Sequence, residues 1–187
     1  MEVLEAIKTR RSIRRYKTTP VDDKTLEQVL EAARWAPSWA NTQCWSFVVV
    51  RNSNIKDELA STLSAVNPAT DAIRIAPVVI VACAKLKKSG CSRREPVTDK
   101  GDSWYMFDVA LAMQNLTLAA HSLGLGTVHV GAFNAEKVAS ILEVSEGFCV
   151  VEMTPLGYPD QESRLTPRKE LSEIAFREKF GDRMEGG

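Results

Sequence analysis

Four arginines surround one serine in the stretch RRSIRRY, residues 10–16. A guanidinium group binds phosphate through paired hydrogen bonds, and the hydroxyl of Ser12 adds a donor, so the stretch could act as a phosphate clamp. Arg10 and Arg14 are four residues apart and would share one face if the stretch were helical. The alternative is a solvated helix end whose cations complement the helix dipole. Composition alone favours that alternative, because most charge runs are solvated surface.

A second stretch, APSWANTQCWSF at residues 36–47, is small and polar around two tryptophans. The amides of Asn41 and Gln43 carry both donors and acceptors, so they could bind the edge of a ring or a polyol. A helix stop followed by a loop would use the same turn-forming residues. This stretch by itself does not distinguish the two interpretations.

A third stretch, GLGTVHVGAF at residues 124–133, does not match the dinucleotide-binding G-x-G-x-x-G pattern, and it follows a helix where that pattern follows a strand. We expect Gly124 to end the preceding helix. Gly131 would let the backbone approach a flat ligand closely. His129 could contact that ligand, although an ordinary packed or exposed histidine fits at least as well.

A fourth stretch, GYPDQESRLTPRK at residues 157–169, adds Arg164, Arg168 and Lys169 after a turn. With the N-terminal arginines it offers a second cationic arm for the same anion. The sequence contains no nucleophile elbow, Walker loop or H-E-x-x-H pair, so hydrolysis and phosphoryl transfer are not indicated. These features favour a protein that holds a phosphorylated, planar cofactor and leaves the chemistry to that cofactor.

The composition narrows the class of protein. The chain has 187 residues, 44% of them hydrophobic and 26% charged, which fits one soluble domain over residues 1–187. Lys plus Arg and Asp plus Glu both number 24, which disfavours nucleic-acid binding. The cysteines and histidines lack metal-ligand spacing, so we expect no metal. The apolar runs are too short to span a membrane and the N-terminus lacks the apolar core of a signal peptide, which predicts a cytoplasmic protein.

Helices and strands are interspersed without strict βαβ alternation, which favours an α+β layered domain over a doubly wound one. Asp22 or Asp23 would cap the second helix and Pro37 would end it. The polar stretch 85–102 is expected to be a long, mobile loop. Helices are expected around Val3, Leu4 and Ile7 and at residues 22–36, 54–66, 103–124 and 134–144. Strands are expected at residues 45–50, 76–83 and 147–159. A short strand or loop is expected at 127–133, and a helix or arm at 168–184.

Four motifs, taken in their order along the chain, resemble motifs of the FMN-dependent nitroreductase family. The resemblance covers nearly the whole chain. RRSIRRY is similar to the family's R-R-S-x-R signature, and APSWANTQCW to its A-P-S-x-x-N-x-Q-P-W segment. DVALAMQNLTLAAHSLGLGTVHVGAF resembles the long central helix and the flavin-facing strand, and PLGYP with the later PRK resembles the C-terminal segment. One departure is Cys44, where the family commonly has proline. A thiol near the flavin could be inert or could alter redox tuning or reactivity, and we favour an inert thiol.

The resemblance implies a sandwich in which helices pack around a central, mostly antiparallel sheet, in a homodimer with FMN at the subunit interface. The basic cluster and a late arginine would hold the phosphate and ribityl chain. The segment after the long helix, and a segment of the partner subunit, would approach the isoalloxazine ring. The implied cofactor-binding residues are Arg10, Arg11, Ser12, Arg14, Pro37, Ser38, Trp39, Asn41, Gln43, His129, Val130, Gly131 and Arg168.

By the same resemblance, the chain is expected to pass hydride from NADH or NADPH to FMN and to reduce nitroaromatics, quinones or related small acceptors by a ping-pong mechanism. No side chain is expected to be catalytic. The backbone N–H of Gly131 would face the redox-active nitrogen of the flavin and favour its reduced form. A flavoprotein of the same fold with other chemistry (dehydrogenase, dehalogenase or flavin-destructase type) and a flavin-binding module without turnover remain alternatives.

The sequence leaves the electron acceptor and the choice between NADH and NADPH open, and it predicts neither a membrane nor a nucleic-acid partner. Arg93, Arg94 and Lys100 in the stretch 85–102 could meet a nicotinamide phosphate or an acidic substrate. A solvated loop is the favoured interpretation of these three residues.

Overall fold

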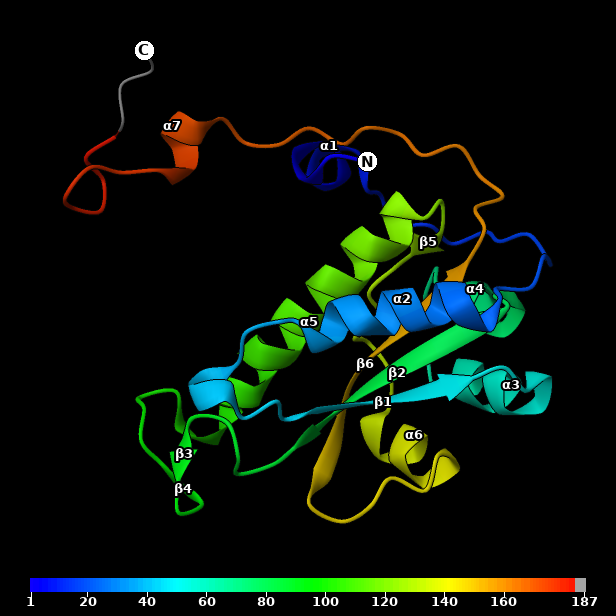
Figure 1. Cartoon of the computed structure of the whole chain (residues 1–187), viewed down its shortest axis with the longest axis horizontal. Helices are drawn as coiled ribbons and strands as arrows, with labels where there is room; N and C mark the ends of the chain where they lie inside the picture. The colour runs from blue at the N-terminus through cyan, green and yellow to red at the C-terminus, as the bar shows by residue number, and fades with distance from the viewer. Residues whose placement is uncertain (184–187) are drawn as a thin grey trace.

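The computed structural model describes residues 1–183 and centres on an antiparallel sheet (Figure 1). The strand order is β1-β2-β6-β5, and each neighbouring pair is antiparallel. This arrangement confirms the predicted α+β class. The strands are β1 (Trp45–Val50), β2 (Val78–Lys85), β5 (Gly126–Thr127) and β6 (Phe148–Gly157), with a separate pair formed by β3 (Cys91–Ser92) and β4 (Glu95–Pro96).

Helices pack against both faces of this sheet. α2 and α5 share a core with one face of β2, while α3, α4 and α6 share a core with the other. Figure 1 shows α2 lying across α5. The helices are α1 (Val3–Thr9), α2 (Asp23–Arg34), α3 (Ser53–Ser61), α4 (Thr70–Ile75), α5 (Tyr105–Ser122), α6 (Ala135–Ile141) and α7 (Leu171–Ile174), with two 3-10 turns, η1 (Trp39–Asn41) and η2 (Gly101–Trp104).

The predicted signals at the ends of α2 and α5 are confirmed. The Asp22 carboxylate accepts a hydrogen bond from the Thr25 N–H at 2.9 Å, so Asp22 rather than Asp23 caps α2. Gly124 has a φ of 79°, and its N–H donates to the carbonyl of His121 as α5 ends. The start of α2 and the end of α5 are therefore set by hydrogen bonds between residues close in sequence.

Three expected elements differ from the structure. The helix expected over 54–66 ends at Ser61, and α4 was not predicted. The apolar, β-branched residues 45–50 predict a buried strand, but β1 is an edge strand and only half-buried, because it pairs with β2 along one edge alone. The stretch 85–102 contains the β3–β4 hairpin, whose two turn residues, Arg93 and Arg94, both have positive φ, and the first residues of η2. The expected long loop therefore includes a hairpin, while its mobility stays a prediction.

The two ends of the chain place apolar side chains on the surface. In α1, Ala6 is buried while Val3, Leu4 and Ile7 are 69%, 68% and 51% exposed. The C-terminal segment runs past α1 and away from the sheet (Figure 1), with α7 as a single short helix in it. The predicted helix or arm is thus an arm, apart from its residue 184, which lies outside the described residues.

The arginine-rich stretch is extended, so the shared helical face considered for Arg10 and Arg14 is wrong. α1 ends at Thr9, and Ser12 forms a parallel bridge with Thr127 of β5. The Ile13 N–H donates to the Thr127 carbonyl at 2.9 Å, which directs this backbone bond to the sheet instead of to a helix. Among the described residues, 1–183, no helix is long and apolar enough to cross a membrane.

The close contact between Ile13 and Gly126 gives a prediction. A Cβ at position 126 would lie 2.6–2.9 Å from three side-chain atoms of Ile13. We expect Gly126→Ala to lower the free energy of unfolding by about 1–3 kcal/mol, because overpacking forces the basic stretch off the sheet. Urea denaturation measures the change. Gly131→Ala is the control, since its added Cβ meets no atom within 4 Å. Equal stability of the two variants would contradict this account.

Candidate functional site

The two predicted cationic arms line one hollow of about 850 Å³. One wall comes from the extended stretch after α1, and the other from the segment after β6. Four of the sequence-predicted residues from the N-terminal stretch meet Arg168 there. The lining residues are Arg10, Arg11, Ser12, Arg14, Arg15, Gln161, Glu162, Ser163, Arg164, Thr166 and Arg168.

The charges in this arginine hollow are not balanced by ion pairs. Within residues 1–183, none of its arginines lies in a salt bridge with a carboxylate. Burial, followed by the neighbouring charges of Arg11 and Arg168, lowers the pKa of Arg10. The buried Nε of Arg11 has no hydrogen-bond partner in this part of the chain. An anion with several oxygen acceptors would relieve this repulsion and pair that donor.

Hydrogen bonds to one side chain join the two walls. The Oε1 atom of Gln161 accepts from the N–H groups of Arg14 and Arg15, each at 2.9 Å. The hydroxyl of Tyr16 donates to the Ile13 carbonyl at 2.6 Å, and burial raises the pKa of that hydroxyl. Sequence reasoning missed Gln161, because a lone glutamine in a turn carries no spacing signal for a contact 147 residues away.

A second, smaller hollow of about 110 Å³ adjoins the first through Arg14, which lines both. His129, Val130 and Gly131, which are expected from the sequence to lie beside a flat ligand, line this hollow. Gly131 faces open space, since an added Cβ would meet nothing within 4 Å. Asn67 and Pro68, which precede α4 and which the sequence had not indicated, also line this hollow.

The side chain of His129 has a partner that sequence reasoning also missed. Its Nδ1 atom lies 2.8 Å from Oε1 of Glu152 on β6. The Thr154 hydroxyl donates to the Val128 carbonyl at 3.0 Å, which ties the same stretch to the strand. The backbone of Val130 exchanges two hydrogen bonds with Met153. β6 thereby holds residues 128–131 in place beside Arg14.

The third predicted segment, Pro37–Gln43, lines neither hollow. It lies at the N-terminal end of α5, where the Trp39 N–H donates to Asp108 at 3.1 Å. The arginine stretch lies toward the other end, where Thr9 Oγ1 is 2.8 Å from Nε2 of His121. Asp108 and His121 are roughly 20 Å apart along the helix axis, because each helical residue advances about 1.5 Å. One chain therefore does not bring the three predicted segments together.

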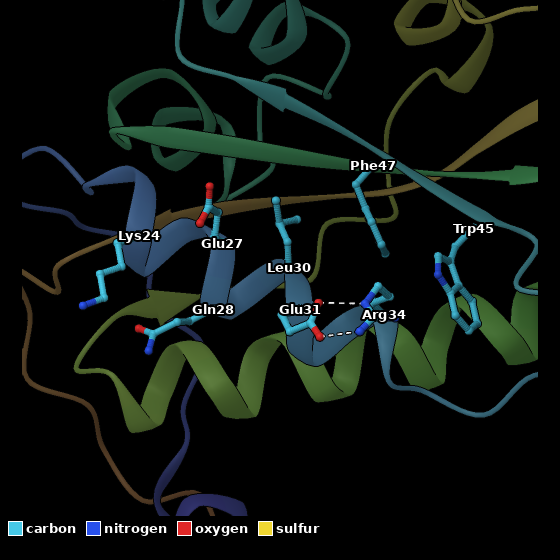
Figure 2. A pocket seen from close by; sticks show the side chains of 8 residues that line it. All are labelled: Lys24, Glu27, Gln28, Leu30, Glu31, Arg34, Trp45 and Phe47. Carbon is cyan, nitrogen blue, oxygen red and sulfur yellow. Dashed lines mark hydrogen bonds and ion pairs between the residues drawn. The ribbon is translucent and has the colours of Figure 1, made fainter.

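Another hollow, of about 730 Å³, lies between α2 and β1 (Figure 2). Leu30, Trp45 and Phe47 give it an apolar lining, and Glu31 and Arg34 pair at its rim. Hydrogen bonds from Arg34 and Trp35 lower the pKa of Glu31 to about 2. The two carboxylates of this lining, Glu27 and Glu31, are balanced by Lys24 and Arg34. The arginine hollow has an excess of positive charge and is the better candidate for a phosphorylated ligand.

Comparison with known proteins identifies the fold family. A sequence profile described as Nitroreductase family matches residues 7–72 and 62–158. The chain belongs to the nitroreductase family. Both the fold and the family predicted from the motifs are thereby confirmed.

Members of the nitroreductase family resemble this chain over most of its length. A Methanothermobacter thermautotrophicus protein, named provisionally as an NADH dehydrogenase/NAD(P)H nitroreductase, is 35% identical over 85% of this chain and 78% of its own. The FMN reductase [NAD(P)H] of Bacillus subtilis is 29% identical over 96% of this chain and 74% of its own. The crystal structure of a nitroreductase family protein from Clostridium novyi NT has a TM-score of 0.77 at 30% identity, covering 98% and 97% of the two chains.

Cys44, the departure from the family's motif, is buried against a carboxylate. Its Sγ lies 3.8 Å from Oδ2 of Asp108, and 1% of the residue is exposed. Burial, followed by the Asp108 charge, raises the pKa of the Cys44 thiol to about 12. A thiol with so high a pKa stays protonated at neutral pH and is a poor nucleophile.

This environment predicts the order of cysteine alkylation. At pH 8 iodoacetamide is expected to modify the half-buried Cys91 well before Cys44, and before Cys83, whose pKa burial raises to about 11. Peptide mass spectrometry after timed labelling measures the rates. All four cysteines should react in urea, which controls for peptide recovery. Native labelling of Cys44 as fast as Cys91 would show that its thiolate is accessible.

Proposed function

We propose that this nitroreductase-family chain is an FMN-dependent oxidoreductase that takes hydride from NAD(P)H and reduces nitroaromatic, quinone or related small acceptors by a ping-pong mechanism. The general class, an NAD(P)H-dependent flavin oxidoreductase, follows from its family and from relatives named FMN reductase [NAD(P)H] and NAD(P)H nitroreductase. The specific acceptors and the kinetic mechanism are the proposal.

The arginine hollow is the observation that carries the proposal. Its guanidinium groups, none of which forms a salt bridge within residues 1–183, and the Nε of Arg11, which has no hydrogen-bond partner there, fit the terminal phosphate of FMN. Ser12 and Thr166 add hydroxyl groups on the same lining, which suit the phosphate and the ribityl chain. Gln161 would hold the Arg14 and Arg15 backbone in position before the ligand arrives, so less order is lost on binding.

The adjoining hollow of about 110 Å³ would hold part of the flat ring of the same cofactor. Bound FMN would supply the redox chemistry, accepting a hydride and releasing electrons to a second substrate. Gly131 leaves its backbone open to that ring, and its N–H would stabilise negative charge there. Glu152 would fix the orientation of the His129 ring. In this proposal no side chain needs to act as an acid or base, because an exposed site receives protons from water.

A homodimer would complete the site. The Pro37–Gln43 segment lines neither hollow of its own chain, so its proposed approach to FMN requires a second copy. Exposed apolar residues on α1, on the start of α5 and on the C-terminal arm offer surfaces for that copy: Val3, Leu4, Ile7, Met106, Phe107, Leu165, Leu171 and Phe180. The four free cysteines suit a reducing compartment, which supports a cytoplasmic setting.

An anaerobic titration tests the proposal. The purified protein, loaded with FMN, is expected to show flavin absorption that bleaches within seconds on addition of NADH or NADPH and recovers with a quinone or nitroaromatic compound. Initial rates with both substrates varied should give parallel double-reciprocal lines. Bound flavin that neither nicotinamide reduces would favour another redox chemistry or a non-catalytic flavin protein. Failure to bind FMN would overturn the proposal.

Variants of the arginine hollow test the phosphate assignment. Arg14→Ala and Arg168→Ala are each expected to weaken FMN binding roughly ten- to hundredfold, since each removes a charge-assisted hydrogen bond worth about 1.5–3 kcal/mol. Fluorescence titration measures the Kd. Arg74→Ala is the matched control, because Arg74 is exposed and pairs with Asp57 and Asp71 outside the hollow. An unchanged Kd in both hollow variants would refute the clamp.

A further inference from the structure

A buried carboxylate joins two loops at the start of α5. Asp108 is 1% exposed and belongs to the first turn of that helix. From the segment 38–44, the Trp39 N–H donates to both carboxylate oxygens, at 3.1 and 3.2 Å, and the Thr42 hydroxyl reaches Oδ2 at 3.5 Å. From the stretch 86–101, the Ser89 hydroxyl donates to Oδ2 at 2.5 Å. One side chain thus receives donors from two separate loops.

Within the described residues, the Asp108 carboxylate has donors but no directly paired cation. Among residues 1–183 it forms no salt bridge, so neutral donors and the N-terminal dipole of α5 must compensate its charge. A buried carboxylate that loses such donors carries a large desolvation penalty. The carboxylate therefore depends on both loops staying in place, and each loop is held by the carboxylate.

The segment 38–44 requires such an anchor because its backbone is strained. Ala40, Asn41 and Gln43 have φ angles of 43°, 54° and 47°, a region that non-glycine residues seldom occupy. Strain of this kind persists where the surroundings hold the backbone in place. The ring of Trp39 adds a second contact, lying 5.1 Å from that of Trp104 in an edge-to-face arrangement. Asp108 thus binds the backbone N–H of Trp39, and Trp104 contacts the ring of Trp39.

Three basic residues of the stretch 86–101, together with Lys85 at the end of β2, form a cluster of positive charge. Lys85, Lys87, Lys88 and Arg94 line a hollow of about 730 Å³, in which Glu146 is the acidic residue. Gly90, one residue after Ser89, packs so closely on Trp104 that an added Cβ would lie 2.5 Å from the Trp104 Cβ. The position of this cationic hollow is therefore tied to the position of Trp104 and Asp108.

We infer that Asp108 is a positioning residue that fixes the segment 38–44 and the stretch 86–101 as one unit, so that loosening either loop loosens the other. On the proposed function, this unit presents Asn41 and Gln43 to the FMN of the partner subunit. The cationic hollow would attract the phosphate groups of the incoming nicotinamide substrate. Asp108 contacts neither molecule and acts through the two loops.

Hydrogen exchange in the cofactor-free protein tests the coupling directly. Ser89→Ala removes a donor from one loop, and we expect the Trp39 amide on the other loop to exchange roughly tenfold faster, because its own acceptor loses a restraint. Asp108→Asn should have an intermediate effect and Asp108→Ala the largest. Thr117→Val is the matched control, since Thr117 is equally buried on α5 but donates within its own helix. It should lower stability without changing Trp39 exchange.

Steady-state and binding measurements then separate positioning from general destabilisation. Ser89→Ala and Asp108→Asn are expected to raise the Kd for FMN and the KM for the nicotinamide severalfold while changing kcat less. If Asp108→Ala does not fold, the other two variants carry the test. Faster exchange confined to residues 86–101 in Ser89→Ala would overturn the inference. A wild-type protein without FMN binding would overturn the proposed function, while the exchange result would still decide the coupling.

Discussion

The two-sided burial of β2 is the constraint on which the rest of the structure depends. Residues Val78 to Ala84 are all nearly inaccessible to solvent, and alternate side chains point into two different cores. A strand buried on both faces must be covered by helices on both sides. α2 and α5 therefore occupy one face, and α3, α4 and α6 the other. The segments that form the candidate site therefore lie at the ends of the sheet and of α5.

α5 separates two parts of the site that have opposite electrostatic needs. Near its C-terminal end, guanidinium groups crowd together, and none forms a salt bridge within residues 1–183. Near its N-terminal end, the Asp108 carboxylate is buried and, in the same described part of the chain, is satisfied by neutral donors from two loops instead of by an ion pair. The first arrangement is complementary to an external anion, and the second is complete within the chain. The first therefore suits ligand binding and the second suits the positioning of loops.

Local signals in the sequence predicted the parts of the fold that depend on neighbours along the chain. Asp22 caps α2 and Gly124 ends α5 because both use hydrogen bonds within a few residues. The apolar residues of α1 show the limit of such signals. Val3 and Leu4 form an amphipathic pattern, yet they face outward because this chain offers them no covering surface. A periodic pattern predicts that a face will be covered but not by which element.

The sequence by itself determined the family, the succession of helices and strands, and the residue types able to hold a phosphorylated flat cofactor, because motifs and periodicity are properties of neighbouring residues. Only the tertiary structure decided that the basic stretch is extended along β5, that Gln161 joins the two walls of the arginine hollow and that Glu152 meets His129. It also decided that the Pro37–Gln43 segment lies away from the arginines of its own chain. These outcomes depend on strand register and on the length of α5, which bring together or separate residues that are distant in sequence.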